Sequence, residues 1–180
     1  QAFYFVTAVT KNREHSFGEI SNGIMTLTEL GKQLELQLKE TPSIRPDMNI
    51  TVDVFAVMPD HFHAIIGIGA NPYNKTSKWI TPSFSPPIKN LGSIMRGIKS
   101  SVTTYARKND IPFEWQRLYH DRVIRNDNEY YRIRKYIIDN VKNNQLFDIA
   151  DYYDSKKVLE DEGLNINDLN DIKTNSFTYN

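Results

Sequence analysis

Residues 54–66 read Val54-Phe55-Ala56-Val57-Met58-Pro59-Asp60-His61-Phe62-His63-Ala64-Ile65-Ile66, two apolar runs separated by a Pro-Asp dipeptide. Proline at the first turn position and aspartate at the second suit a type I turn. We therefore predict an antiparallel hairpin whose strands cover residues 50–58 and 61–68. This hairpin is the centre around which the rest of the fold is predicted.

The histidine pair at the start of the second strand is the strongest chemical signal in the chain. Successive side chains of a strand point to opposite faces, so His61 and His63 share one face while Phe62 points into a core. Two neutral imidazoles on a rigid strand form half of a divalent-metal site. A hydrogen-bonded histidine pair at a strand edge has the same spacing, so the context must decide between the two interpretations.

Apolar patterning predicts the remaining elements. They are a buried strand over residues 2–10, an amphipathic helix over 26–39, a loop over 41–49, a proline-rich surface loop over 69–89, a helix over 91–107, a strand over 113–125, and a helix that is capped at Asn126 or Asp127 and runs to about Asn143. The order strand, helix, hairpin, helix, strand, helix predicts an α+β sandwich, in which helices cover a small antiparallel sheet.

Composition limits the classes of protein and of metal site. The chain has 180 residues, 39% of them hydrophobic, which fits one domain with a substantial core. Cysteine is absent, so any metal must be held by imidazole, carboxylate or amide oxygen. No apolar run reaches the roughly 18–20 residues of a membrane span, and no secretory signal is visible. We expect a cytoplasmic protein that does not bind membranes.

Charge divides the chain although its formal net charge is +0. Residues 91–147 contain eleven Lys or Arg against six Asp or Glu, whereas residues 148–180 contain three against eight. We therefore predict a domain over residues 1–147 and an acidic C-terminal tail over residues 148–180. A local excess of basic residues is compatible with a nucleic-acid partner, and equally with a solvated surface.

Two Tyr/Asn pairs compete to complete a site at the histidines. Tyr136 and Asn140 stand one helical turn apart, on the flank of the apolar stripe of the last predicted helix. Tyr105 and Asn109 have the same spacing, but Tyr105 lies on the apolar stripe of its helix and Asn109 lies where asparagine is a favoured cap. In either pair an amide oxygen is a plausible third ligand for a hard or borderline divalent ion. Spacing favours Tyr136 without excluding Tyr105.

Three segments together resemble the REP-associated branch of the single-tyrosine HUH transposases, where HUH denotes histidine, a hydrophobic residue and histidine. They are MPDHFHAII (58–66), WQRLYHDRVIRND (115–127) and RIRKYIIDN (132–140), and the similarity runs from Phe3 to about Asn144. The resemblance implies an α+β, ferredoxin-like fold of the HUH endonuclease type. It also implies that His61, His63 and Asn140 bind a metal and that Tyr136, rather than Tyr105, is the catalytic tyrosine.

The resemblance further implies a metal-dependent, Mg²⁺- or Mn²⁺-using endonuclease and strand transferase that acts on single-stranded DNA through a 5′-phosphotyrosine. Its partner would be a DNA hairpin or palindromic repeat, its location the bacterial nucleoid, and a homodimer is one expected assembly. The basic residues near Tyr136 are candidate phosphate contacts. They are Arg122, Arg125, Arg132, Arg134 and Lys135. The alternatives are a catalytically inactive module that binds single-stranded nucleic acid and a His-x-His metal phosphoesterase.

Overall fold

The computed structural model describes residues 2–73 and 89–142. The chain divides into two units, residues 1–144 and 145–180, and the first contains all the elements described below. The expected boundary between residues 147 and 148, the acidic tail and most of the proline-rich loop lie outside the described residues. None of the helices in the described part is both long enough and apolar enough to cross a membrane.

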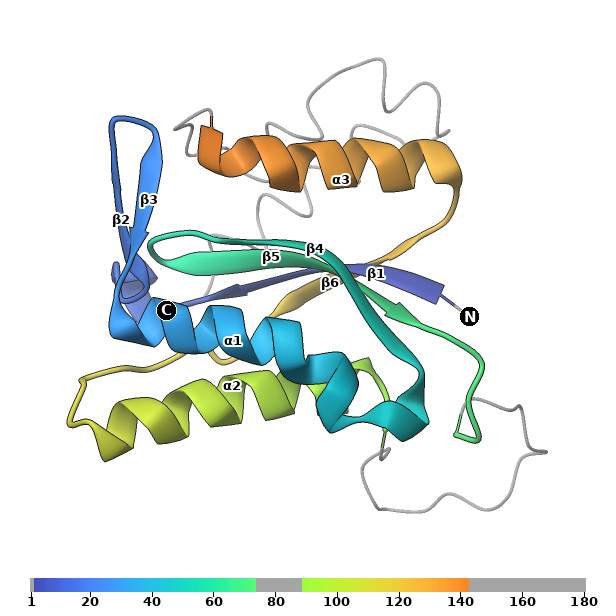
Figure 1. Ribbon diagram of the computed structural model, residues 1–180, viewed down its shortest axis with the longest axis horizontal. Coiled ribbons are helices and arrows are strands. Elements are labelled where there is room, and N and C mark those ends of the chain that lie inside the picture. Colours follow the sequence, from blue (N-terminus) through green and yellow to red (C-terminus); the bar gives the residue numbers. More distant parts are fainter. Residues whose placement is uncertain (1, 74–88, 143–180) are drawn as a thin grey trace. The chain divides into compact units, whose positions relative to one another are not determined.

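A four-stranded antiparallel sheet forms the centre of the first unit (Figure 1). Its strands are β1 (Ala2–Val9), β4 (Ile50–Val57), β5 (His61–Ile68) and β6 (His120–Ile124), in the order β4-β5-β1-β6. Helix α1 (Glu29–Ile44) joins β1 to β4, and α2 (Leu91–Lys108) joins β5 to β6. This is the ferredoxin-like arrangement, so the predicted fold class and the predicted β4–β5 hairpin are confirmed.

The sheet separates two apolar layers. Helices α1 and α2 cover one face, and α3 (Asp127–Lys142) covers the other (Figure 1). The main core lies under α1 and α2 and includes the buried side chains of Val6, Ala8, Phe62, Ala64, Ile66, Leu34, Leu38, Ile94 and Ile98. The α3 side carries the alternate strand residues Phe5 and Ile65, together with Ile133 and Ile137 of the helix, all buried. Period-2 alternation in β1 and β5 therefore serves a core on both faces.

The sequence-based prediction was wrong between residues 18 and 44. Residues Gly18–Ser21 and Ile24–Leu27 form a hairpin, β2 and β3, where only turns and a helix start were expected. Its turn is Asn22-Gly23, and both residues have positive φ, as a type I′ turn requires. Helix α1 starts after this hairpin, where Thr28 accepts a hydrogen bond from the Gly31 N–H. The helix also continues past Thr41 into the expected loop and ends at Ile44.

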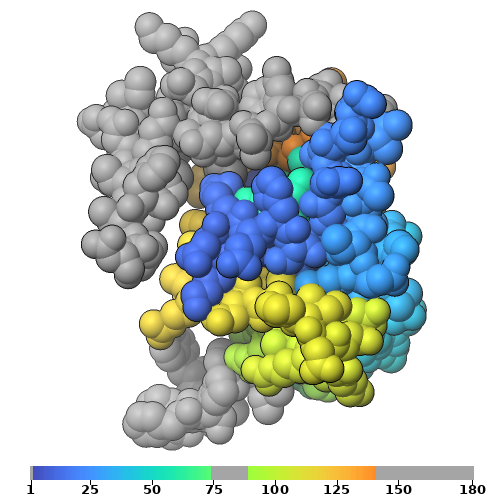
Figure 2. Space-filling model, turned by 90° about the vertical axis from the view of Figure 1, so that its left-hand side faces the viewer, coloured from blue at the N-terminus to red at the C-terminus, as the bar shows by residue number. Residues whose placement is uncertain are grey.

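The predicted strand over residues 113–125 is shorter than expected, and only His120–Ile124 belongs to the sheet. The preceding segment crosses the surface beside the segment that follows β1 (Figure 2), and the Lys11 N–H donates to the carbonyl of Glu114. Trp115 forms only an isolated bridge with Thr10. In the segment before β6, the backbone carbonyls of Gln116 and Arg117 accept hydrogen bonds from the Lys99 ammonium.

Candidate active site

The two histidines lie next to each other on the sheet face that α3 covers. His61 opposes Val9 and His63 opposes Thr7 across β1. Their ring centroids are 4.7 Å apart, whereas Phe62 is fully buried on the opposite face. The predicted shared face of the histidines is therefore confirmed.

His63 is buried and has a partner at each ring nitrogen. Its Nδ1 lies 2.7 Å from the Thr7 hydroxyl, and its Nε2 lies 3.2 Å from the Tyr136 hydroxyl. Burial lowers the pKa of His63 well below its usual range, and the neighbouring His61 lowers it further. The ring is therefore neutral near pH 7. We assign the tautomer in which Nδ1–H donates to Thr7, since it leaves the Nε2 lone pair facing Tyr136.

His61 is oriented by a carboxylate in the preceding turn. Its Nδ1 lies 2.5 Å from Oδ1 of Asp60, which is only 3% exposed. Burial by itself raises the pKa of Asp60, but the hydrogen bond with His61 and the charges of His61 and Arg13 lower it below its usual value. The carboxylate is therefore ionised near pH 7. Because Nδ1 of both histidines is occupied by Thr7 or Asp60, a further ligand would bind at the Nε2 atoms, and at His63 it would replace the contact with the Tyr136 hydroxyl.

Helix α3 brings Tyr136 to this pair. The Tyr136 ring centroid lies 5.3 Å from that of His63 and 6.2 Å from that of Phe5. The competing Tyr105 lies on α2, on the other side of the sheet, and packs against the main core. Asn109 caps that helix and donates its side-chain N–H to the Tyr105 carbonyl. Of the two tyrosines, Tyr136 is the one that contacts a histidine of the pair, His63.

Asn140 lies one turn beyond Tyr136, level with His61. Helix α3 runs opposite to β5, because Tyr130 packs on Phe3, which opposes Gly67, whereas Tyr136 packs on His63. Four helical residues rise about 6 Å and two strand residues about 6.6 Å, so the step from Tyr136 to Asn140 matches the step from His63 to His61. Asn140 is 5% exposed, and its side chain makes no hydrogen bond to another described residue.

These residues fit a divalent ion by their chemistry. Two imidazoles with oriented Nε2 atoms and a buried amide that bonds to no other described residue are suitable donors for a borderline or hard cation. Within residues 2–73 and 89–142, no group of three or more His, Cys, Asp or Glu could hold a metal. Among these residues, a third ligand at His61 and His63 would have to be of another type, and Asn140 is such a residue.

The candidate DNA contacts are largely engaged within the chain. Three of the five basic residues pair with carboxylates: Arg122 with Glu129 at 2.8 Å, Arg134 with Asp53 at 3.1 Å, and Lys135 with Asp139. Arg125 is exposed and Arg132 is half-buried. Their role as phosphate contacts stays a prediction. The ion pairs mean that DNA would have to compete with protein carboxylates for three of them.

Two residues of the site were not recognised in the sequence. Asp60 was interpreted only as a turn residue, and Thr7 only as part of a buried strand. The available signals were a carboxylate directly before the first histidine and a hydroxyl inside the apolar run AFYFV-T-AV. His120 of β6 pairs with Thr7 of β1 and is exposed on the same sheet face.

Comparisons with known proteins were made for the sequence and for the fold. No family model matches the chain. An uncharacterised protein of Haemophilus influenzae is 36% identical over 146 residues, which are 78% of this chain and 80% of that protein. A solved structure of a REP-associated tyrosine transposase bound to a REP hairpin aligns with a TM-score of 0.53 and 20% identity, over 83% of this chain and 73% of the other. A candidate transposase from Deinococcus radiodurans aligns with a TM-score of 0.44 and 15% identity, over 77% and 89% of the two chains.

Proposed function

Because the chain belongs to the same family as the Haemophilus influenzae protein and has the fold of a REP-associated tyrosine transposase, we propose that it is a transposase-like enzyme that cuts and rejoins single-stranded DNA. The observation that carries the proposal is the 3.2 Å approach of the Tyr136 hydroxyl to Nε2 of His63. A tyrosine held beside two oriented imidazoles is suited to nucleophilic attack on a phosphodiester. A purely structural tyrosine needs no such neighbours.

The proposed reaction begins with Tyr136. Its hydroxyl gives its proton to a water molecule and its oxygen attacks the scissile phosphorus. A bond forms between that oxygen and phosphorus, the P–O3′ bond breaks, and the released 3′-oxygen takes a proton from water, so that one proton is lost and one is gained. The 5′-phosphate remains on Tyr136, and a DNA 3′-hydroxyl can later attack it and rejoin a strand without ATP. In the structure the phenol donates to Nε2 of His63, which places the attacking oxygen beside the proposed metal site; a metal on that nitrogen would replace this hydrogen bond.

The free phenol, with a pKa near 10, is a weak nucleophile at neutral pH. In the proposal, His61, His63 and Asn140 hold Mg²⁺ or Mn²⁺, which supplies Lewis-acid stabilisation of the phosphate charge. Thr7 and Asp60 contribute by holding the two rings in place. Tyr136 and His63 of one chain are already in contact, which supports attack within a single subunit even if the protein forms a homodimer.

We also propose a hairpin-bearing single strand as the substrate. The support is that the REP-associated tyrosine transposase with this fold was solved with a REP hairpin. Arg132, one helical turn before Tyr136, would then contact a phosphate close to the scissile bond, and Arg125, which follows the β6 residue that pairs with Phe3, a more distant one.

Covalent attachment tests the proposal. The full chain is incubated with Mn²⁺ and a library of labelled hairpin-bearing single strands, and the products are separated on a denaturing gel. We expect a labelled protein band in the wild type that Tyr136→Phe abolishes. Binding of the same DNA should stay within about twofold, because the change removes one hydroxyl and almost no volume.

Tyr105→Phe is the matched control, since it removes the same hydroxyl from the other side of the sheet. Loss of the adduct in Tyr105→Phe and its persistence in Tyr136→Phe would refute the assignment of the nucleophile. Cleavage without an adduct would instead indicate a phosphoesterase. Binding without cleavage by the wild type would indicate a binding module.

A further inference from the structure

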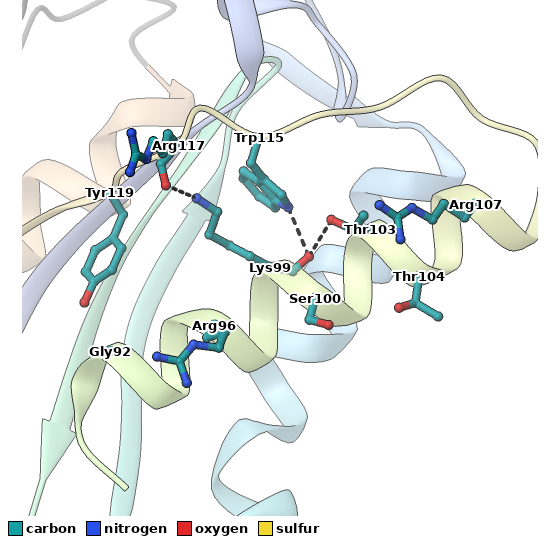
Figure 3. A pocket seen from close by; sticks show the side chains of 10 residues that line it. All are labelled: Gly92, Arg96, Lys99, Ser100, Thr103, Thr104, Arg107, Trp115, Arg117 and Tyr119. Atoms are coloured by element: carbon teal, nitrogen blue, oxygen red, sulfur yellow. Dashed lines mark hydrogen bonds between the residues drawn. The ribbon is translucent and has the colours of Figure 1, made fainter. Parts of the chain in front are cut away.

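A second candidate site lies on α2, on the side of the sheet away from Tyr136. A groove of about 550 Å³ runs between α2 and the segment before β6 (Figure 3). Its polar lining comes mainly from one face of the helix and from residues 115–119. The residues are Gly92, Arg96, Lys99, Ser100, Thr103, Thr104, Arg107, Trp115, Arg117 and Tyr119. Four of these are basic and none is acidic, so the described lining is positively charged.

The arginines of this groove are not neutralised by any carboxylate in residues 2–73 and 89–142. Arg96, Arg107 and Arg117 are exposed, and none forms an ion pair with another residue in the described part of the chain. The basic residues near Tyr136 differ, since Arg122, Arg134 and Lys135 each pair with a carboxylate. The groove therefore carries the stronger uncompensated positive charge of the two surfaces.

The two walls of the groove, α2 and residues 115–119, are held together by hydrogen bonds of Lys99 and Trp115. The Lys99 ammonium donates to the carbonyls of Gln116 and Arg117, and the Trp115 indole N–H donates to the Lys99 carbonyl (Figure 3). Burial lowers the pKa of Lys99. Trp115 is packed on Phe17 and is thus engaged in the core. The backbone that carries the arginines is consequently held in place, so that binding has to order only their side chains.

We propose that this groove binds the sugar–phosphate backbone of nucleic acid at a distance from the cleaved phosphodiester. The inference rests on the proposed function, and it adds a second contact surface to it. Arg96 and Arg107 are separated by about 16 Å along the helix axis, at about 1.5 Å per residue, a span that covers several consecutive phosphates of one strand. The hydroxyls of Ser100 and Thr104 lie between them and are suitable phosphate donors.

The position of the groove indicates which part of the DNA it binds. Helix α3 with Tyr136 covers one face of the sheet and α2 covers the other (Figure 1). A short single strand lying at Tyr136 cannot also lie along α2. The groove therefore binds a folded part of the substrate, such as a hairpin stem, through its backbone and without reading its bases.

Fluorescence anisotropy with a labelled DNA hairpin that carries a single-stranded extension tests this site in the full chain, without added divalent metal. We expect Arg96→Gln and Arg107→Gln each to weaken binding about fivefold and to reduce the slope of log K against log salt by about one. Lys108→Gln is the matched control, because Lys108 is exposed on the same helix and does not line the groove. It should change the affinity less than twofold.

Arginine variants that bind the hairpin as tightly as Lys108→Gln would overturn the proposal. So would variants that lose affinity for phosphatidylserine vesicles but keep their affinity for DNA, since the groove would then serve an anionic lipid surface. Thermal unfolding checks that each variant is folded. The covalent-adduct assay on wild-type protein is a separate measurement: absence of any adduct would refute the proposed enzyme, and loss of hairpin affinity in the arginine variants would still establish the groove.

Discussion

At the scale of single residues, the decisive feature is that each histidine of the pair has a dedicated hydrogen-bond partner. Thr7 lies at Nδ1 of His63 and Asp60 at Nδ1 of His61, at 2.7 Å and 2.5 Å. Such partners fix the ring orientation and the tautomer, and a carboxylate partner also raises the basicity of the imidazole. Thr7 and Asp60 are therefore positioning residues for the proposed metal site.

Their substitution should weaken metal binding while the protein stays folded. We expect Thr7→Val and Asp60→Asn each to raise the Mn²⁺ dissociation constant by about tenfold or more, measured by titration calorimetry. Thr10→Val is the control for Thr7→Val, because Thr10 is equally buried but its hydroxyl bonds to the Glu14 carbonyl. Wild-type affinity in Thr7→Val would exclude the positioning role. Wild-type affinity in the double variant His61→Ala/His63→Ala would place the metal elsewhere.

At the scale of elements, the start of α1 supports the turn that precedes His61. The Phe17 carbonyl accepts a hydrogen bond from Thr28 at the helix N-terminus, and the Phe17 N–H donates to the Pro59 carbonyl. Gly31 allows the helix to lie close to the backbone of Phe17, because a Cβ at this position would lie 2.1 Å from the Phe17 carbonyl oxygen. The first turn of α1 and the Pro59-Asp60 turn are thus joined through one residue.

Gly31→Ala should therefore destabilise the fold even though alanine is the better helix former. Helix propensity favours alanine by about 1 kcal/mol, but relief of the clash requires movement of backbone and should cost more. We expect a net loss of about 1–3 kcal/mol in the free energy of unfolding, measured with urea. Gly92→Ala is the control, since its Cβ would lie no closer than 3.3 Å to any neighbouring atom, and it should be neutral or stabilising. Equal stabilities for the two variants would contradict this account of Gly31.

At the scale of the whole molecule, the neutral net charge conceals opposite local charges. The arginines of the α2 groove and the basic residues near Tyr136 lie in the first unit, whereas residues 148–180 carry an excess of five acidic groups, eight against three. Charges of the same sign as DNA oppose its binding over roughly the Debye length, about 8 Å at physiological salt. We therefore expect the C-terminal segment to weaken DNA binding.

Deletion of the residues after Ala150 tests this expectation. The shortened chain should bind a labelled single strand more tightly, with a larger gain at 50 mM than at 300 mM salt, as measured by anisotropy. Circular dichroism serves as the control for folding. A gain of equal size at both salt concentrations would show that the effect is not electrostatic, and an unfolded product would show that the segment contributes to the core.

Much of the fold and part of the candidate site could be predicted because they depend on local patterns. The Pro59-Asp60 turn, the alternation around Phe62 and the spacing of Tyr136 and Asn140 each follow from a few neighbouring residues. The β2–β3 hairpin has a local signal as well, the Asn22-Gly23 turn, although it was missed.

Only the tertiary structure decided which residues meet across the sheet. The partners Thr7 and His63 are 56 residues apart, and Arg134 and Asp53 are 81 apart. Such contacts depend on the strand order and on the face that each helix covers, which local propensity does not determine. For the same reason the α2 groove, which joins Arg96 to Arg117, could not be inferred from the sequence, and the choice of Tyr136 over Tyr105 rested there on a resemblance. Tyr136 contacts His63 because α3 packs on the face of β5 that carries this histidine.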